Sequence, residues 1–525
     1  MGMKNRLRIQ QESWIIFSGF LISTFVLRGW TFFRSVLDKD ETLYLLVARS
    51  VLQGHPPYVQ VWDHKPPGLF WLFSGAIAIF GDSIASIRIL ACFTIALTSY
   101  LLYKIGTTFE KKGKTIGLIA GIFYLIFTFN NSGTAANAEI LFAPFVTFAF
   151  YLLFNTHQYS KLKIFCIGLL VGLGMQIKYV VVMDFITVLL IGSFQIVTVA
   201  KNKVKDSIKE LLQFYRWIGI GFFLPFVLVI LYFLSVNHFD DYIYSTLIAN
   251  QKYVEMTEFS IERMLSEIGN QIIKHLLLYL SLLILPFHIF LNAIKLSKTE
   301  KQKVLFLGIW FCSTFAATLL SKQFFGHYFL HLLPPLSLLS AYLLVKLAHA
   351  KFEESIIKYY LSIFLILIFP IGQAVYNQLK TTFDFILNRQ IRRIESWNDE
   401  EVIVANYLKT RVDKEDYIYV VNHHLVTYYL TQAKLPTKFV FISHLTRGTS
   451  VIAGRDPLQE LKSILNKKPL YIILSTRSAI PPDYHQILKA QLKKSYTLEK
   501  TLEVDDDSVM IYRFKRAHPE FGGVQ

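Results

Sequence analysis

Long apolar runs, separated by short polar connections, dominate the chain up to about Gln378. About twenty apolar residues span a bilayer as a helix, so each long run predicts a membrane span. Window hydropathy predicts about eleven spans, near residues 14–33, 84–105, 115–131, 138–156, 162–178, 179–200, 214–236, 271–294, 304–320, 327–347 and 356–376. We therefore expect a polytopic α-helical membrane protein.

The charge of the connecting loops alternates along this series of spans. Every second loop carries a lysine cluster, at residues 104–114, 161–163, 201–209, 295–303 and 346–358. The connection 237–270 is instead acidic, with six Asp or Glu residues against Lys252 and Arg263. Because Lys and Arg favour the cytoplasmic side, the N-terminus is predicted to be cytoplasmic and the C-terminal tail extracytoplasmic.

Two stretches and one junction depart from this simple pattern. Residues 66–80 are apolar but short for a span, and residues 41–53 are amphipathic. Both predict helices that lie in the outer membrane interface. The fifth and sixth spans meet near Lys178–Tyr179 without a polar linker, which requires a tight turn. One long helix is the alternative, and it would invert the orientation downstream, against the later lysine loops.

The composition changes after about Gln378, and residues 388–525 contain no run long enough to span a membrane. Short β-rich runs alternate there with helix-like stretches, which is typical of a small α/β domain. The runs are 417–421, 439–442 and 470–474, and the helix-like stretches include 399–411 and 457–467. We predict a membrane domain over residues 1–377 and a soluble extracytoplasmic domain over residues 378–525.

The composition agrees with a membrane protein and disfavours other classes. Hydrophobic residues make up 53% of the chain, and the mean hydropathy is +0.41. The net charge of +17 does not indicate nucleic-acid binding, because the basic residues lie mostly in loops between apolar runs. The three cysteines lie inside apolar runs, so no disulfide framework is predicted. Basic residues precede the first span, but no cleavage motif follows, which predicts an uncleaved helix.

Three carboxylates, Asp38, Asp40 and Glu41, follow the first span directly. Asp38 or Asp40 could cap a helix that begins at Glu41. Alternatively, a carboxylate that is partly desolvated at the edge of lipid could act as a general base. Asp38 and Asp40 also have metal-binding Asp-x-Asp spacing, but no third ligand is in view. We therefore predict no cofactor, with a divalent metal at Asp38 and Asp40 as the alternative.

A second polar cluster on the same outer loop contains Asp63, His64 and Lys65, followed by Pro66-Pro67. Lys65 could extend along apolar surface and keep its charge in water. It could instead bind a phosphate, since the prolines restrict the backbone and an ammonium group suits this anion. Asp63 would then orient either Lys65 or His64.

Other polar residues stand at the predicted outer ends of later spans. Glu139 opens the fourth span, where the helix dipole already favours a carboxylate. Lys178 lies in an apolar hairpin and needs an anionic partner, which is Glu139, Asp184 or a ligand. His327 precedes Tyr328, and a lone histidine there is more often an interface residue than a ligand. With the two clusters above, these residues all fall on one side of the membrane.

Several motifs together resemble a known family. They are Asp40-Glu41-Thr42-Leu43-Tyr44, Tyr58-Val59-Gln60-Val61-Trp62-Asp63-His64-Lys65-Pro66-Pro67-Gly68, Asn137-Ala138-Glu139, Phe324-Phe325-Gly326-His327-Tyr328 and Leu332-Leu333-Pro334-Pro335. The chain resembles the lipid-linked-sugar glycosyltransferases of the GT-C superfamily. Within it, the chain is most similar to the branch of protein O-mannosyltransferases and the lipid A aminoarabinose transferase. The resemblance covers residues 10–350.

The resemblance implies an inverting transfer of a sugar from a polyprenyl-phosphate donor to a hydroxyl of an envelope glycan, lipid or protein. The location would be the outer face of a bacterial plasma membrane. Asp40 matches the catalytic carboxylate, and Lys65 matches the lysine near the donor phosphate. The predicted substrate-binding residues are Glu41, Asp63, His64, Lys65, Glu139, Lys178, His327 and Tyr328. In the aminoarabinose branch a Glu stands at the position of His64, which argues against an aminoarabinose donor and a lipid A acceptor.

Two other classes of function share part of this pattern. A transporter or flippase of lipid-linked sugars would need similar spans and a polar outer pocket. It should also have broken helices or inverted repeats near the membrane midplane, and the sequence has no sign of either. A non-catalytic envelope assembly protein, held by its soluble tail, is the third possibility.

Overall fold

The computed structural model describes residues 3–155, 160–199, 204–280, 282, 284, 296–351, 355–393, 399–446, 450–476, 480–504 and 507–515. The chain forms two compact units. The first contains Met1–Phe33, Lys65–Asn237 and Thr257–Arg392, and the second contains Arg34–His64, His238–Met256 and Arg393–Gln525. The second unit is therefore built from three separate segments of the chain.

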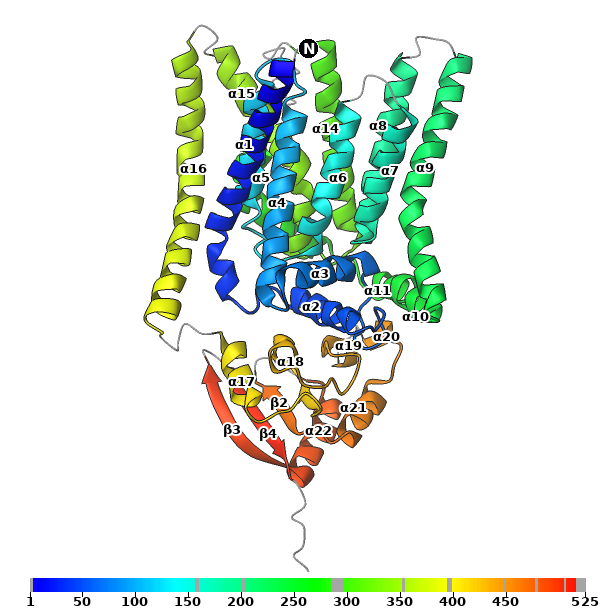
Figure 1. Ribbon diagram of the computed structural model, residues 1–525, viewed down its shortest axis with the longest axis vertical. Helices are drawn as coiled ribbons and strands as arrows, with labels where there is room; N and C mark the ends of the chain where they lie inside the picture. Colours follow the sequence, from blue (N-terminus) through cyan, green and yellow to red (C-terminus); the bar gives the residue numbers. More distant parts are fainter. Residues whose placement is uncertain are drawn as a thin grey trace, which may run out of the picture. The chain divides into compact units, whose positions relative to one another are not determined.

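The first unit is helical, and most of its helices stand upright beside one another (Figure 1). Its helices are α1 (Met3–Leu27), η1 (Gly29–Phe33), α3 (Pro67–Phe80), α4 (Ile84–Gly106), α5 (Gly113–Phe127), α6 (Ala138–Phe154), α7 (Lys161–Met175), η2 (Tyr179–Val181), α8 (Val182–Val199), α9 (Val204–Ser235), α12 (Ile261–Lys274), α14 (Lys298–Leu320), η4 (Gly326–Leu332), α15 (Leu333–Lys351), α16 (Ile356–Phe385) and η5 (Ile386–Ile391).

Within the described residues, five helices are long and apolar enough to cross a membrane, or up to six with one bent pair counted as a span. The prediction of a polytopic helical membrane protein is confirmed. The prediction of about eleven spans also counted shorter apolar helices, among them α5 and α6. Half of the expected span 271–294 lies outside the described residues. Length therefore accounts for much of the difference between the two counts.

Glycines allow two pairs of upright helices to approach closely. On α7, a Cβ atom at Gly168 or Gly172 would collide with backbone oxygens of α9, and a Cβ at Gly221 of α9 would collide with Phe165. Gly117 of α5 lies in the same way against the backbone of Tyr103 in α4. Small residues at such contacts are typical of helix packing in membranes.

The junction predicted to be a tight turn separates two helices. α7 ends at Met175, the short helix η2 begins at Tyr179, and α8 follows from Val182. Figure 1 shows α7 and α8 standing side by side, and the two helices are in contact. The alternative of one long helix through Lys178 is therefore wrong.

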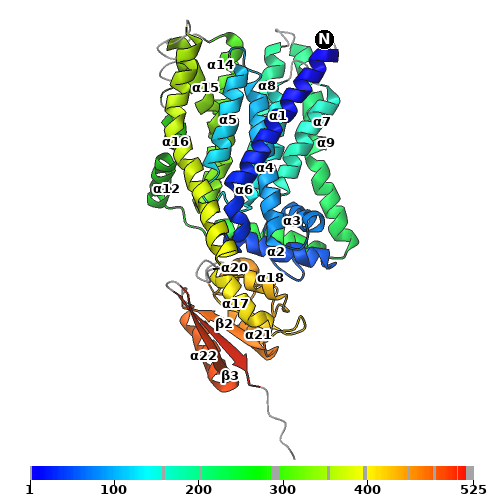
Figure 2. The ribbon, with the colours of Figure 1, turned by 60° about the vertical axis from the view of Figure 1, so that its left-hand side comes forward.

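The two short helices of the first outer loop are present close to their predicted bounds. α3 begins at Pro67, where proline is well suited because its missing N–H would have no partner in the first turn. It lies across the lower end of α4 in both views (Figure 1, Figure 2). The predicted helix 41–53 is α2 (Lys39–Leu52), and it belongs to the second unit.

The second unit combines short helices with one four-stranded sheet. Its elements are α2, α10 (Phe239–Ile243), η3 (Tyr244–Ile248), α11 (Ala249–Glu255), α17 (Glu400–Lys409), β1 (Ile418–Val420), α18 (Val426–Thr431), α19 (Ser443–Thr446), α20 (Ser450–Ala453), α21 (Pro457–Asn466), β2 (Tyr471–Ser475), α22 (Pro482–Ser495), β3 (Tyr496–Val504) and β4 (Asp507–Phe514). The strand order is β1-β2-β4-β3, with β1 and β2 parallel and the other pairs antiparallel.

The α/β character of this region is confirmed, with differences in detail. The run 417–421 contains β1, and the run 470–474 overlaps β2 in all but its last residue. The stretches 399–411 and 457–467 contain α17 and α21. The run 439–442 is not a strand. The hairpin of β3 and β4 was not predicted, because its many charged residues obscure the alternation of apolar side chains.

The three segments of the second unit are joined by specific contacts. The indole N–H of Trp62 donates a hydrogen bond to Ser245 Oγ over 3.0 Å. The backbone N–H of Trp62 donates to the carbonyl of Lys438 over 2.9 Å. Trp62 is 2% exposed, so the first outer loop contributes to the core of this unit. The predicted boundary near residue 378 follows the change in composition. The packing instead groups residues 34–64 and 238–256 with residues 393–525.

Candidate active site

The three carboxylates that follow the first span have different roles in the fold. Asp38 is the N-cap of α2, and its side chain accepts a hydrogen bond from the N–H of Asp40 over 3.0 Å. Glu41 is fully buried, and its Oε1 accepts from the N–H of Leu37 over 2.9 Å. Asp40 is half-buried in the first turn, where Tyr44 donates its hydroxyl to Oδ2 over 3.3 Å. Asp38 and Glu41 therefore stabilise the start of α2, and Asp40 is the best placed of the three for chemistry.

These roles bear on the Asp-x-Asp pattern as a metal site. The side chain of Asp38 is engaged with the amide of Asp40, as expected for a helix cap. Among the residues that the structure describes, no three His, Cys, Asp or Glu side chains gather as a group that could hold a metal ion. Asp38 thus has a structural role at the start of α2, and a divalent metal at Asp38 and Asp40 stays a prediction.

The second polar cluster is ordered around His64. Asp63 is 2% exposed, and its Oδ1 accepts from the N–H of His64 over 2.6 Å and lies 3.2 Å from His64 Nδ1. The side-chain amide of Asn250 donates to the carbonyl of His64 over 2.7 Å. The ring of Tyr253 stacks on the imidazole, with 5.3 Å between centroids. Asp63 thus orients His64, whereas the sequence alone left Lys65 as the other possibility.

Lys65 begins the part of the loop that belongs to the first unit, and it is half-buried. Pro66 and Pro67 follow it, and Gly68 then lies directly on the backbone of Gln176. A Cβ atom at Gly68 would be 2.6 Å from the carbonyl oxygen of Gln176. Glycine is therefore required here, because no side chain fits between the start of α3 and the segment that follows α7.

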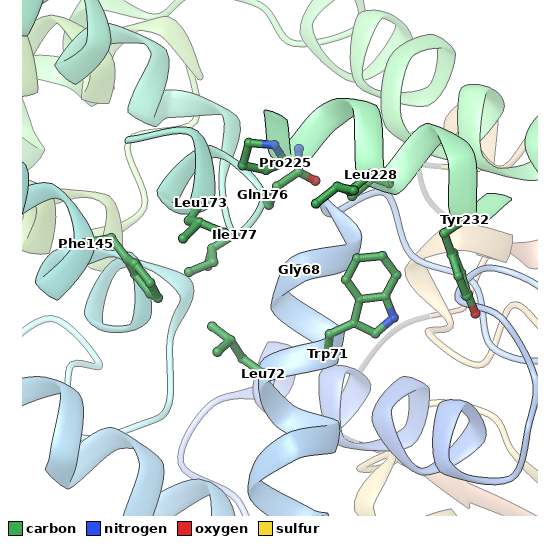
Figure 3. Close-up of a pocket in the computed structure, with 11 residues that line it drawn as sticks. Gly68, Trp71, Leu72, Phe145, Leu173, Gln176, Ile177, Pro225, Leu228 and Tyr232 are labelled. Atoms are coloured by element: carbon green, nitrogen blue, oxygen red, sulfur yellow. The ribbon is translucent and has the colours of Figure 1, made fainter. Parts of the chain in front are cut away.

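An apolar cavity of about 440 Å³ opens beside this contact (Figure 3). Its lining residues come from α3, α6, α7, α9 and the segment after α7: Gly68, Trp71, Leu72, Phe145, Leu173, Gln176, Ile177, Pro225, Leu228, Val229 and Tyr232. Trp71 and Tyr232 meet edge to face, with 5.3 Å between their centroids. The lining suits an aliphatic ligand, and charged side chains stand close to it in sequence, with Lys65 before Gly68 and Lys178 after Ile177.

Lys178 is paired with Glu139 inside the first unit. The two side chains are 11% and 2% exposed, respectively. The ammonium of Lys178 also lies 4.0 Å from the ring centroid of Tyr328, and the rings of Tyr328 and His327 meet edge to face at 4.7 Å. These four predicted site residues therefore lie together. Of the partners considered for Lys178, Glu139 is the one observed.

A neighbouring polar group was missed by the sequence reasoning. His331 Nε2 lies 2.7 Å from Asp184 Oδ2, and the indole of Trp310 donates to Asp184 Oδ1 over 3.0 Å. His331 lines a small cavity together with Glu139 and Lys178. An aspartate inside an apolar helix needs polar partners. The position of Asp184 in such a helix was therefore the sequence signal that could have indicated this polar group.

The predicted site residues thus fall into two sets. Asp40, Glu41, Asp63 and His64 belong to the second unit, and Lys65, Glu139, Lys178, His327 and Tyr328 belong to the first.

Comparison with known proteins finds similarities in sequence and in fold. Residues 64–233 match the family model described as dolichyl-phosphate-mannose-protein mannosyltransferase. The structure resembles that of ArnT from Cupriavidus metallidurans bound to undecaprenyl phosphate, with a TM-score of 0.61 and 14% identity over 95% of this chain and 97% of that one. The chain therefore shares the fold of ArnT over nearly its whole length.

Three further matches cover other parts of the chain or repeat the same fold. The apo form of the same ArnT has a TM-score of 0.60 and 14% identity, over 96% of this chain and 98% of that one. An uncharacterized protein of Aquifex aeolicus (strain VF5) is 25% identical over 403 residues, which are 75% of this chain and 87% of the relative. Residues 398–515 match the model named competence-induced protein Ccs4 C-terminal domain. The C-terminal segment is thus recognisable by its own sequence.

Proposed function

We propose that this protein is an inverting glycosyltransferase of the GT-C superfamily that moves a sugar from a polyprenyl-phosphate donor to a hydroxyl group of a cell-envelope acceptor. The reaction would take place at the outer face of a bacterial plasma membrane. The observation that carries the proposal is the apolar cavity that α3 helps to line. This helix begins at Pro67, shortly after Lys65 in the chain. A donor that is half hydrocarbon and half phosphate needs such a surface with a cation at its rim.

Two cations stand on the segments that meet at this cavity. In the chain, Lys65 comes shortly before Gly68, and Lys178 comes shortly after Gln176. Gly68 and Gln176 are in direct contact. We assign Lys65 to the donor phosphate. Lys178 is paired with Glu139 and lies over the ring of Tyr328. We assign these residues and His327 to the region that binds the sugar phosphate head group of the donor. The structure of ArnT with undecaprenyl phosphate supports a lipid-linked donor of this kind.

Asp40 is assigned as the general base. Its carboxylate takes the proton of the acceptor hydroxyl while the oxygen forms a bond to the anomeric carbon. The bond from that carbon to the phosphate oxygen breaks, and polyprenyl phosphate leaves with the electron pair. Lys65 stabilises the negative charge that develops on this phosphate. The donor is already activated, so no nucleotide or metal is required, and positioning supplies much of the rate.

Glu41, Asp63 and His64 support this arrangement in different ways. Glu41 holds the start of α2, which carries Asp40. Asp63 orients His64 because its carboxylate accepts a hydrogen bond from the backbone N–H of His64 and also lies beside the imidazole ring of His64. We assign His64 to the acceptor or the sugar, because its neighbour Lys65 is assigned to the phosphate.

A turnover assay with the full-length protein in nanodiscs tests the proposal. Undecaprenyl-phosphate sugars serve as donors, and released undecaprenyl phosphate is measured together with the glycosylated acceptor. We expect Asp40→Asn to lower turnover about 100- to 10,000-fold, because it keeps the size of the side chain and removes the proton acceptor. Lys39→Gln is the matched control, since Lys39 is an exposed neighbour on the same helix.

The outcome separates the proposal from transport. A flippase would move the lipid-linked sugar between leaflets and leave its glycosyl-phosphate bond intact. Bond cleavage that depends on Asp40 supports a transferase. Normal turnover by a well-folded Asp40→Asn variant would falsify the assignment of the base, and transbilayer movement without cleavage would favour a flippase.

A further inference from the structure

The segment that leads into α2 is held by a side chain from far along the chain. Residues 34–38 have no regular secondary structure, yet Arg34 and Ser35 both contact Asp399. Arg34 Nη1 lies 2.7 Å from Asp399 Oδ1, and the N–H of Ser35 donates to Oδ2 over 2.5 Å. Ser35 is 5% exposed and Asp399 is 3% exposed. One buried carboxylate thus binds this segment at two points.

Helix capping does not explain this carboxylate. Asp399 occupies the N-cap position of α17, where an aspartate side chain usually accepts a hydrogen bond from the first turn of its own helix. Here the side chain makes no such bond. Only its backbone carbonyl accepts from the helix, from Val402 over 3.0 Å and from Ile403 over 3.2 Å. The carboxylate is directed instead to Arg34 and Ser35.

A second acidic side chain reinforces the same point. The hydroxyl of Ser35 donates to Glu401 Oε2 over 3.4 Å. The other oxygen of Glu401, Oε1, lies 3.1 Å from His424 Nε2. Glu401 is 6% exposed. Ser35 is therefore bound through both its backbone and its side chain by residues at the start of α17.

The far end of α2 is held by the same part of the chain. Arg49 Nη1 donates to the carbonyl of Tyr429 over 2.7 Å, and the guanidinium centre lies 3.4 Å from the centroid of the Tyr429 ring. Figure 1 shows α18, which carries Tyr429, against α2, and the two helices are in contact. Asp40 lies in the first turn of α2, between these two attachments.

We propose that Asp399 is a positioning residue for the Asp40 carboxylate, so that the C-terminal part of the chain places the general base. This inference rests on the proposed function, in which Asp40 takes the acceptor proton. Asp399 acts through residues 34–38 and touches no substrate. Small displacements of a catalytic group lower the rate steeply, because the reacting atoms must be held in a narrow range of distances.

Three variants of the full-length protein test the inference. Asp399→Ala removes both contacts, whereas Asp399→Asn keeps an acceptor for Ser35 and loses the charge that pairs with Arg34. We expect a kcat about 10- to 100-fold lower for Asp399→Ala, a smaller loss for Asp399→Asn, and a donor KM within about twofold of normal. Glu415→Gln is the control, since Glu415 pairs with Lys434 on the surface of the same unit.

Hydrogen exchange of the peptide 34–44 provides a readout that does not depend on activity. We expect its amides to exchange at least about tenfold faster in Asp399→Ala and at the normal rate in Glu415→Gln. Unchanged exchange, or an unchanged kcat in the folded variant, overturns the inference. An equal loss of donor affinity and kcat also overturns it. If Asp40→Asn retains normal turnover, the proposed function fails, and the exchange measurement then decides whether Asp399 orders this segment.

Discussion

Two buried ion pairs of the first unit contrast with Asp40 of the second unit. In the first unit, Glu139 and Lys178 form a pair that is almost completely buried, and so do Glu300 and Lys346, whose charged atoms lie 2.5 Å apart. In the second unit, Asp40 remains half-buried beside a tyrosine hydroxyl. An apolar surrounding forces charges into pairs, whereas a half-buried carboxylate keeps the access that a general base requires.

The largest expected effect concerns the side of the membrane on which the C-terminal part of the second unit lies, because a reporter fusion is either active or silent. The alternating lysine loops predict that residues 378–525 lie outside the cytoplasm. A phosphatase fused after Arg411 should therefore be active, and a cytoplasmic reporter at the same position should be silent. A phosphatase fused after Lys111, in a lysine-rich loop, is the inactive control. The opposite pattern would mean that the number of spans before Arg411 is even.

The buried pair Glu139–Lys178 should be costly to break on one side only. Glu139→Gln leaves the ammonium of Lys178 buried without its counter-charge, so we expect a loss of about 3–5 kcal/mol of stability. The double variant Glu139→Gln, Lys178→Met removes both charges and should lose much less. Thermal unfolding in detergent, followed by the fraction of protein that stays monodisperse, measures this difference.

The pair Glu300–Lys346 provides the control that separates stability from function. Its double variant Glu300→Gln, Lys346→Met should show a similarly small loss of stability and keep normal donor affinity. The Glu139 and Lys178 double variant should bind donor more weakly, because that pair is assigned to the sugar phosphate region. Equal donor affinity in both double variants would make Glu139–Lys178 a purely structural pair.

A smaller effect is expected at Lys65. A hydrogen bond to a charged group contributes about 1.5–3 kcal/mol, so Lys65→Ala should weaken donor binding about 10- to 100-fold. Lys65→Arg should retain part of the affinity, since a phosphate accepts either cation. A donor titration in nanodiscs measures this, with Lys39→Ala as the control on the same outer loop. Weakened acceptor use with unchanged donor affinity would place Lys65 on the acceptor side.

Local sequence signals predicted several helices and helix ends well. Pro66-Pro67 before an apolar run predicted α3, and α3 begins at Pro67. The capping role of Asp38 was one of the two interpretations considered, and it is observed. These features depend on a few neighbouring residues, so the sequence carries them directly. The hairpin β3–β4 was missed because its many charged residues obscure the alternation of apolar side chains.

By itself, the sequence determined that this is a helical membrane protein with a turn at Lys178–Tyr179, because the length of an apolar run is a local property. It also determined that Lys178 needs an anionic partner, because the cost of a buried charge is local as well. Only the tertiary structure decided that Glu139 is this partner and that Asp184 binds His331 and Trp310 instead. It also decided that Asp399 binds Arg34 and Ser35, hundreds of residues away along the chain. Such pairings depend on which segments pack together, and no pattern of neighbouring residues encodes that choice.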